Sequence, residues 1–343
     1  MRPKVFKTMF LKEFGEERII RELAEKFKVR HPRVLKAIGD DASVTVQKGG
    51  QALLATTDIL IEDTHFRARL TPPCLLGRKS LSISLSDIAA MGGSALFFLV
   101  SIGFPGSVKK DFLDSLYKGI SGRAKECGAL LIGGNTARSG KITVSTTVLG
   151  EMPVDEVVYR SGAGKNDLVW VTGTPGESAL GLTLLKKHGA GAIRGPFKKA
   201  VMRHLDPTPR MKAGRALAVK RLATSMIDIS DGVLLDLKRV IEASGAGAVV
   251  ELDSLPVSTE MRDYIKLGKR PFAADLILSG GEDYELLFTA PEKNTPRISA
   301  LSKELKLRIT PIGRIVDKKK GLKVIGPDGT EIKIKSLGFE HFK

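Results

Sequence analysis

The sequence predicts a two-domain α/β or α+β protein, and three observations lead to this class. With 343 residues, the chain is long enough for two domains that each bury a core. In both halves, short apolar stretches typical of strands alternate with longer stretches of helical periodicity. A loop-like segment at residues 151–166 interrupts this alternation. We therefore expect one domain over residues 1–150 and a second over 151–343.

The elements of the first half follow from the spacing of apolar residues. Helices are predicted where these residues recur every three or four positions, and strands where they run together or alternate. In the helix at 75–91, Ser80, Ser84 and Asp87 would share one polar face, and a glycine pair would end the helix. The expected elements are a helix at 9–28, an acidic turn at Gly39, a strand at 52–56 that ends at Thr57 and Asp58, helices at 75–91 and 109–126, a strand at 96–104, a short strand into Gly133 and Gly134, and a β-rich segment at 141–151.

The second half repeats the alternation without repeating the sequence. Residues 167–173 (DLVWVTG) are typical of a strand, and a glycine turn then leads to a helix at 178–188. Strand and helix patterns continue to about residue 326. Asp236 falls inside one of the predicted helices, where we expect it on a solvated face.

Composition narrows the classes of function. The net charge is +17, from 55 Lys and Arg against 38 Asp and Glu. We expect a basic surface that attracts phosphorylated small molecules, and a nucleic-acid-binding protein is the alternative. The chain has no apolar run of about 18 residues, which argues against a membrane span. Cys74 and Cys127 lack metal-ligand spacing, and charges in the apolar N-terminal stretch argue against a secretory signal, so we expect a cytoplasmic protein.

Acidic residues beside glycine and aliphatic residues are the main functional signal. Charge in apolar surroundings is costly unless the carboxylate is paired, hydrogen-bonded or bound to a cation. A single such Asp is more often a helix cap or turn residue, but several together favour magnesium, which prefers oxygen ligands and substrate phosphates. The candidate ligands are Asp40, Asp41, Thr56, Thr57, Asp58, Asp87, Asp228 and Asp231, with Asn135 as a neutral oxygen.

Phosphate contacts are expected from glycine turns at 92–93, 133–134, 173–176 and 279–281, whose backbone N–H groups suit anions. Arg160 is a candidate to neutralise phosphate charge, although a plain surface arginine fits its surroundings nearly as well. The P-loop, dinucleotide and protein-kinase motifs are absent from the sequence. No triad spacing indicates a covalent nucleophile, and phosphoryl transfer needs none. His65 alone is more typical of a surface or packing residue.

Taken in order, the motifs resemble those of the thiamine-monophosphate kinases, a family in the superfamily that includes aminoimidazole ribonucleotide synthetase. The matching stretches cover nearly the whole chain, and their combination is specific to the family although single motifs are shared across the superfamily. They are GDDAS (39–43), TTDILIEDTHF (56–66), SLSDIAAMGG (84–93), LIGGNTARSG (131–140), RSGAGKND (160–167), VTGTPGESALGL (171–182), RHLDPTPR (203–210), SMIDISDGVLLDL (225–237), SGGEDYELLFT (279–289) and GFEHF (338–342).

The resemblance implies a two-domain aminoimidazole ribonucleotide synthetase-like architecture, with an N-terminal domain that forms a homodimer and a C-terminal α/β domain. It also implies direct, in-line transfer of the ATP γ-phosphoryl group to thiamine monophosphate, with several Mg²⁺ ions. By position, the implied metal ligands are Asp41, Thr56, Thr57, Asp58, Asp87, Asp228 and Asp231; the ATP contacts are Tyr117, Gly134, Asn135, Arg160 and Ser230; and the substrate contacts are His65, Glu282 and Phe339. Neither nucleic acid nor a membrane is expected as a partner.

Other enzymes of this superfamily are the alternatives. A selenophosphate synthetase would carry a reactive Cys or Sec near its N-terminus, whereas the first cysteine here is Cys74. A hydrogenase-maturation relative would end in a cysteine-containing tail, and an aminoimidazole ribonucleotide synthetase lacks the IEDTHF and GFEHF stretches in this form. The sequence departs from the family pattern at Asn135, where many members carry Asp, and at Asp206, which replaces a residue that is often basic.

Overall fold

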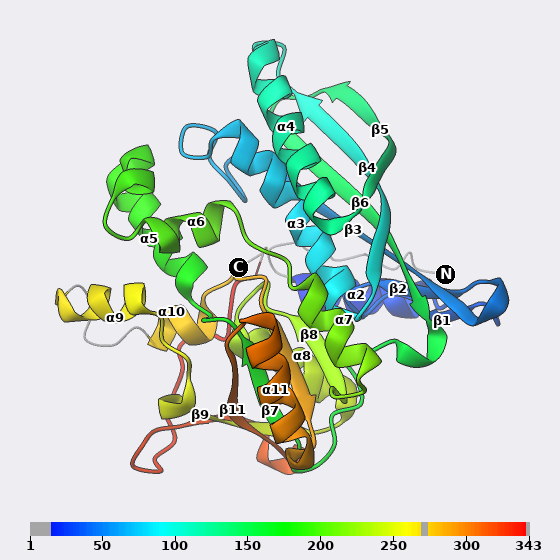
Figure 1. Cartoon of the computed structure of the whole chain (residues 1–343), viewed down its shortest axis with the longest axis vertical. Helices are drawn as coiled ribbons and strands as arrows, with labels where there is room; N and C mark the ends of the chain where they lie inside the picture. Colours follow the sequence, from blue (N-terminus) through cyan, green and yellow to red (C-terminus); the bar gives the residue numbers. More distant parts are fainter. Residues whose placement is uncertain (1–14, 269–273, 341–343) are drawn as a thin grey trace, which may run out of the picture.

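The computed structural model describes residues 15–268 and 274–340, which fold into two six-stranded sheets with helices around them (Figure 1). The family pattern GFEHF therefore lies partly outside the described residues, as do residues 9–14 of the helix predicted at 9–28. The first-half elements are α2 (Glu16–Lys26), β1 (Val34–Lys36), β2 (Ser43–Val46), β3 (Gln51–Ile61), α3 (Pro73–Ala90), β4 (Ser94–Phe104), α4 (Lys110–Cys127), β5 (Leu130–Arg138) and β6 (Thr143–Pro153). The second-half elements are β7 (Leu168–Thr172), α5 (Glu177–His188), α6 (Lys198–Leu205), α7 (Met211–Val219), β8 (Ser225–Asp228), α8 (Val233–Ser244), β9 (Gly247–Glu251), α9 (Thr259–Lys266), α10 (Ala274–Ser279), β10 (Leu286–Ala290), α11 (Thr295–Leu305), β11 (Ile309–Val316) and β12 (Leu322–Ile325).

The two sheets confirm the predicted mixed class. The first has the strand order β1-β2-β3-β6-β4-β5, and the second β12-β9-β11-β7-β10-β8. Among the described strands, neighbours are antiparallel except for the β4–β5 and β12–β9 pairs, which are parallel. The first sheet continues to Pro153, and the division at residue 150 stays a prediction.

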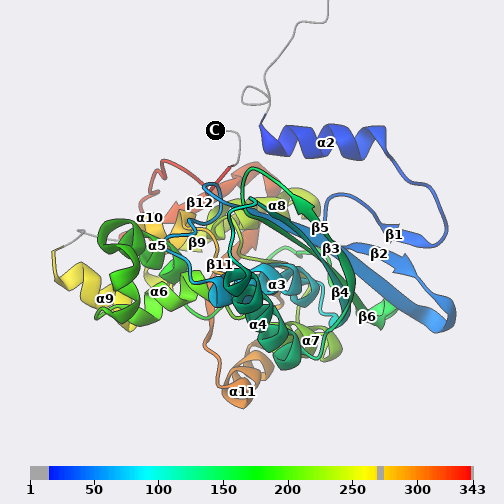
Figure 2. The ribbon, with the colours of Figure 1, turned by 90° about the horizontal axis from the view of Figure 1, so that it is seen from above.

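Helix α3 is the structural link between the two halves. It has no amphipathic pattern, because apolar and small residues cover its whole circumference, and such a helix is stable only when it is buried. It packs on β3 and β6 of the first sheet, and also contacts α7 and β8 of the second half. Gly77 allows α4 to approach closely, since a Cβ there would lie 2.0 Å from the Leu116 carbonyl oxygen. Figure 2 shows α3 and α4 on the same side of the first sheet.

The second sheet buries both of its faces. On β7, Trp170 belongs to a core that is continuous with that of the first sheet, and it stacks on Phe288 of β10 at 6.2 Å between ring centroids. The neighbouring residues Val169 and Val171 point to the opposite face and pack in a second core with residues of α5 and α8. Because side chains alternate along β7, one face of this strand packs in the core shared with the first sheet, and the other face packs in the second core.

The structure corrects four local predictions. Strand β3 continues through Thr56–Asp58 to Ile61, because all eleven of its residues pair with β6. Gly133 and Gly134 lie within strand β5 rather than in a turn. Asp236 is fully buried and not solvated. The glycines at 173–176 do not offer a free helix N-terminus, because the N–H groups of Gly176 and Ser178 already donate to the Asp283 carboxylate.

Other predicted elements are confirmed within one to three residues at their ends. Helix 75–91 corresponds to α3, and Gly92 with φ 79° follows it, as expected for a helix end. The N-terminal helix is confirmed over Glu16–Lys26, where no residue is buried, and Figure 2 shows it beside the main body. Of the helices in residues 15–268 and 274–340, not one is both long and apolar enough to cross a bilayer.

Candidate active site

Three buried or half-buried aspartates from distant segments meet between the two sheets. Asp41 precedes β2, Asp87 lies near the end of α3, and Asp228 is the last residue of β8. One carboxylate oxygen from each lies within 4.8 Å of the others. Like charges at this spacing repel, so the cluster is costly unless protons or a cation neutralise it.

The pKa values in this cluster report that cost. Burial, followed by repulsion from the neighbouring aspartates, raises the pKa of Asp87 and of Asp228 well above the usual range. Burial raises the pKa of Asp41 to about 6, although the Arg160 guanidinium opposes the shift. In addition, Asp41 Oδ2 and Asp228 Oδ2 are buried without a hydrogen-bond partner among the residues that the structure describes. Unpartnered carboxylate oxygens that converge are the donor set that Mg²⁺ prefers, so the cluster fits such an ion.

Strand β3 adds Thr56 and Asp58 to one side of this cluster. The Thr56 hydroxyl donates to Asp87 Oδ2 at 2.5 Å, and Ser84 Oγ of α3 donates to Asp58 Oδ2 at 2.8 Å. Burial raises the pKa of Asp58, although the hydrogen bond from Ser84 opposes the shift. Because side chains alternate along a strand, the Thr57 side chain points to the other face, where its hydroxyl pairs with that of Thr147 at 2.9 Å.

Arg160 lies at the other side of the cluster, in the connection between the two sheets. Its Nη2 and Nε donate to Asp41 Oδ1 at 2.5 and 3.1 Å. The backbone N–H of Arg160 donates to Asp40 Oδ1 at 3.2 Å, and Lys36 pairs with the other Asp40 oxygen. Asp40 therefore has Lys36 as a counter-ion, although its Oδ2, like Asp41 Oδ2, is buried without a hydrogen bond among the described residues.

A cavity of about 590 Å³ opens beside these acids and is lined by both halves of the chain. It brings together predicted site residues from four segments that are far apart in the sequence. Those that line it are Thr57, Asp58, His65, Ser230, Asp231, Glu282 and Phe339. Within it, the His65 ring accepts a hydrogen bond at Nδ1 from the Ile61 N–H at 3.0 Å. A lining that combines charged groups with an aromatic ring suits a ligand that is partly charged and partly ring-shaped.

The loop that carries Asp231 is held by a buried carboxylate. Asp236 Oδ2 accepts hydrogen bonds from the N–H groups of Ser230, Asp231 and Gly232, each at 3.1 Å. Arg239 pairs with both Asp231 and Asp236 at 2.7 Å. Asp231 thus faces the cavity but does not belong to the three-aspartate cluster.

The structure does not bring three predicted residues to this site. Gly134 and Asn135 lie on β5, at the edge of the first sheet, and Tyr117 lies on α4. Strands β6 and β4 separate β5 from β3, so at about 4.8 Å per strand Asn135 is about 14 Å across the sheet from β3. The Asn135 side chain is exposed and accepts a hydrogen bond from the Thr136 N–H.

Sequence reasoning missed several residues of the cavity and its wall. Arg67, Lys186 and His204 line the cavity, and Lys79 pairs with Glu282 at 2.8 Å. Lys79 offered little signal, since it follows Arg78 directly in a helix of mostly apolar and small residues, and the sequence does not show which of the two cations is buried. The others lie in segments of ordinary polarity, and only the fold brings them to the cavity.

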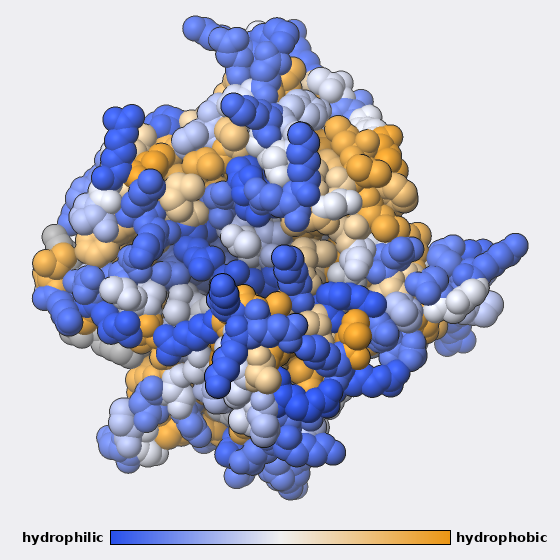
Figure 3. Space-filling view, in the orientation of Figure 1, coloured by the Kyte–Doolittle hydropathy of each residue, from blue (hydrophilic) through white to orange (hydrophobic). Residues whose placement is uncertain are grey.

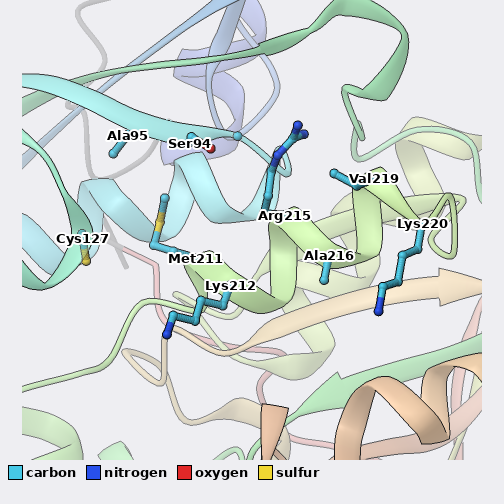
Figure 4. A pocket seen from close by; sticks show the side chains of 10 residues that line it. Ser94, Ala95, Cys127, Met211, Lys212, Arg215, Ala216, Val219 and Lys220 are labelled. Atoms are coloured by element: carbon cyan, nitrogen blue, oxygen red, sulfur yellow. The ribbon is translucent and has the colours of Figure 1, made fainter. Parts of the chain in front are cut away.

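A second cavity, of about 430 Å³, lies away from the acids between α7 and the start of β4 (Figure 4). Its described lining includes Cys127, Lys212, Arg215 and Lys220 but no carboxylate. Arg215 pairs with Glu156, and Lys220 pairs with Glu304. Two of its three cations are therefore already neutralised, and the chemistry of the molecule is concentrated at the first cavity.

Comparison with known proteins agrees with this geometry. Residues 39–152 match the family described as AIR synthase related protein, N-terminal domain, and residues 164–325 match the corresponding C-terminal domain. The thiamine-monophosphate kinase of Salmonella typhimurium is 34% identical over 96% of this chain and 98% of its own length. The chain belongs to the thiamine-monophosphate kinase family. The Bacillus subtilis member is 33% identical over 92% of this chain and 96% of its own.

Solved structures extend the family assignment to the fold. The complex of AaThiL with AMPPCP and TMP superposes on this chain with a TM-score of 0.83, at 32% identity, and covers 98% of this chain and 99% of its own. Escherichia coli HypE, a hydrogenase maturation protein, has a TM-score of 0.69 at 17% identity, which shows a shared fold alone. Both the predicted family and the predicted two-domain architecture are therefore confirmed.

Proposed function

We propose that this protein transfers the γ-phosphoryl group of ATP to thiamine monophosphate, which gives thiamine diphosphate and ADP. The observation that carries the proposal is the acid cluster with unpartnered oxygens, beside a cavity lined from both halves of the chain. The family relatives named thiamine-monophosphate kinase and the complex of AaThiL with AMPPCP and TMP support it.

We propose that Asp41, Asp87 and Asp228 hold magnesium, with Asp58 and Asp231 completing the sites at the cavity wall. Several ions would neutralise the repulsion between two phosphate-bearing substrates. Thr56 orients Asp87 through its hydroxyl, and Ser84 does the same for Asp58. Thr57 can contribute only from its backbone or from the other face of β3, and Asn135 is too far across the sheet to join the same ions.

The transfer is proposed to be direct and in line. A phosphate oxygen of thiamine monophosphate bonds to the γ-phosphorus while the bond to the ADP oxygen breaks, so no group of the protein is phosphorylated. The chain supplies positioning and charge, which account for most catalysis in this class of reaction. Arg160, which donates to Asp41, would neutralise a phosphate group of ATP. Ser230 would contact ATP from the loop that Asp236 holds.

His65, Glu282 and Phe339 are proposed to bind thiamine monophosphate in the cavity. Its thiazolium ring is cationic, so an aromatic face and a carboxylate stabilise it. The side chain of Phe339 lines the cavity and is half exposed, so part of its ring can meet a ligand there.

We also propose a homodimer formed through the uncovered side of the first sheet. Leu130, Leu131 and Ile132 on the edge strand β5 are 62%, 48% and 54% exposed, and Phe97 on β4 is exposed as well. Figure 3 shows a hydrophobic patch at the upper right, where Figure 1 places β4 and β5. An apolar, unpaired edge strand is prone to associate, and a partner chain would cover it. Tyr117, Gly134 and Asn135 lie near this edge, so we propose that they contact ATP in the partner's site.

The proposed partners are thus ATP, thiamine monophosphate and a second copy of the chain, with neither nucleic acid nor a membrane. Cys74 and Cys127 are free thiols in the structure, which fits the expected cytoplasmic setting.

The test is a coupled assay of ADP release with purified protein and magnesium. We expect turnover with thiamine monophosphate and none with free thiamine, which lacks the accepting phosphate. Chelation of magnesium should abolish the turnover. Product analysis should detect thiamine diphosphate, and ADP release that does not depend on thiamine monophosphate would contradict the proposal.

A further inference from the structure

Lys79 is a buried cation that stability does not explain. It lies on α3 with only 1% of its surface exposed, and its Nζ pairs with Glu282 Oε1 at 2.8 Å. Transfer of an ammonium group from water to a protein interior is unfavourable, and replacement of a buried ion pair by apolar residues is often neutral or stabilising. An ion pair kept in such a place is therefore a candidate for a role in function.

The second oxygen of Glu282 is also occupied. His204 Nδ1 lies 3.3 Å from Glu282 Oε2 and 3.1 Å from Ser178 Oγ, and both His204 and Ser178 are buried. Burial, and then the nearby Lys79, lowers the pKa of His204 to about 3, so its imidazole is neutral. Burial raises the pKa of Glu282, but the charge and hydrogen bond of Lys79 lower it, and the carboxylate stays ionised.

The backbone of Glu282 is fixed in an unusual conformation. Its φ is 64°, in the left-handed region that residues with a Cβ rarely adopt, and its N–H donates to the Ser230 carbonyl oxygen at 2.6 Å. The preceding Gly281 packs directly on the same segment, since a Cβ there would lie 2.7 Å from the Ser230 oxygen. Backbone and side-chain contacts together hold the carboxylate in the cavity wall with His65 and Phe339.

The ion pair also joins the two halves of the site. Lys79 and Asp87 are eight residues apart on α3, which corresponds to about 12 Å along a helix. Glu282 precedes β10 in the second half, and its loop contacts the Ser230–Asp231 loop. Lys79 thus ties the Glu282 carboxylate to the same helix that supplies Asp87 to the acid cluster.

We propose that Lys79 is a positioning residue that, with His204, holds the Glu282 carboxylate where it receives the cationic ring of thiamine monophosphate. The inference rests on the proposed function. It assigns to Lys79 an effect on the binding of one substrate, exerted through Glu282 and not by contact with ATP or the metal site.

The experiment is a double-mutant cycle with separate kinetics for each substrate. Lys79→Met should raise KM for thiamine monophosphate about ten- to hundredfold, whereas KM for ATP should stay within about twofold. Glu282→Gln should have a similar effect, and Lys79→Met/Glu282→Gln should be no worse than Glu282→Gln alone. As a matched control, Lys220→Met removes the exposed pair with Glu304 and should leave both KM values unchanged.

The possible results distinguish a failure of the proposed function from a failure of the inference about Lys79. Wild-type protein without activity on thiamine monophosphate overturns the proposed function and this inference with it. Active wild type whose Lys79→Met variant keeps its KM for thiamine monophosphate overturns the inference alone, as do additive effects in the double variant. If Lys79→Met does not fold, Lys79→Met/Glu282→Leu removes both charges, and its KM for thiamine monophosphate should equal that of Glu282→Leu. A higher KM in that double variant also overturns the inference.

Discussion

Two groups of buried carboxylates differ in what completes their hydrogen bonds. Asp41, Asp87 and Asp228 lie close together, and two of them keep an oxygen without a partner among the described residues. Asp283 and Glu285, a few residues apart in the second half, are equally buried. Their oxygens accept from N–H groups at the start of α5, from Thr172 and from the Arg210 guanidinium. The first group needs a ligand from outside the chain, and the second does not.

An acidic residue in apolar surroundings can therefore have one of two roles. It can bind a ligand from outside the chain, or it can accept hydrogen bonds from the protein itself. The segments MIDISDG and SGGEDYELL look alike in sequence, with carboxylates between glycine and aliphatic residues. In the first, Asp228 joins a cluster of like charges, whereas in the second, Glu285 forms a buried ion pair with Arg210. Substitutions in the two groups should therefore change different properties, which are activity in the first and stability in the second.

The largest effect is expected at the cluster. Asp87→Asn and Asp228→Asn should each lower kcat/KM by about 10²-fold or more, because charge stabilisation of the phosphoryl groups is lost. Each variant also removes repulsion from the cluster, so its thermal unfolding midpoint without magnesium should be no lower than that of wild type. Activity assays and calorimetry on the same samples measure both quantities. A variant with near-normal turnover would remove its aspartate from the proposed metal site.

The next effect is expected at Glu285, and it concerns stability. Glu285→Gln leaves the largely buried Arg210 without its counter-ion, which should lower the free energy of unfolding by about 3–5 kcal/mol. The companion Arg210→Met/Glu285→Leu removes both charges and should recover much of that loss. Chemical denaturation of the three proteins measures the difference. If Glu285→Gln were as stable as wild type, the contrast between the two groups would fail.

Asp283 provides a test that depends on pH. Burial raises its pKa from 3.8 to about 8, although two backbone N–H bonds oppose the shift. The unfolded chain therefore loses this proton near pH 4 and the folded chain near pH 8, so the contribution of Asp283 to stability falls as the pH rises through that window. In Asp283→Asn the group does not titrate. The stability of wild type relative to this variant should decrease from pH 5 to pH 8 in denaturant titrations, and a constant difference would argue against the raised pKa.

The smallest effect is expected at an exposed carboxylate. Asp114 pairs with Lys110 one turn away on α4, where both side chains are more than half exposed. Solvent and salt screen such a pair, so Asp114→Asn should change the free energy of unfolding by at most about 0.5 kcal/mol and leave kcat/KM unchanged. A larger change would contradict the expectation that exposed carboxylates matter less than the clustered or the hydrogen-bonded buried ones.

Much of the fold was predictable from local pattern. The alternation of strands and helices, the shape of α3 and its glycine end follow from the side chains of neighbouring residues, and these elements are confirmed. The end of β3 was not predictable, since its last residues are polar and are kept in the strand by pairing with β6. Likewise, nothing near Asp236 in the sequence indicates that three backbone N–H groups would surround its carboxylate.

The sequence by itself determined which residues carry charge into apolar surroundings, because hydrophobicity and glycine content are local properties. It also determined the family, through the order of these motifs. Only the tertiary structure decided which carboxylates obtain protein donors, since those donors come from remote segments: Gly176 for Asp283, Arg210 for Glu285, and Lys79 for Glu282. The fold supplies donors to Asp283, Glu285 and Glu282, whereas Asp41, Asp87 and Asp228 converge on one another, which is why this cluster fits a cation and those three acids do not.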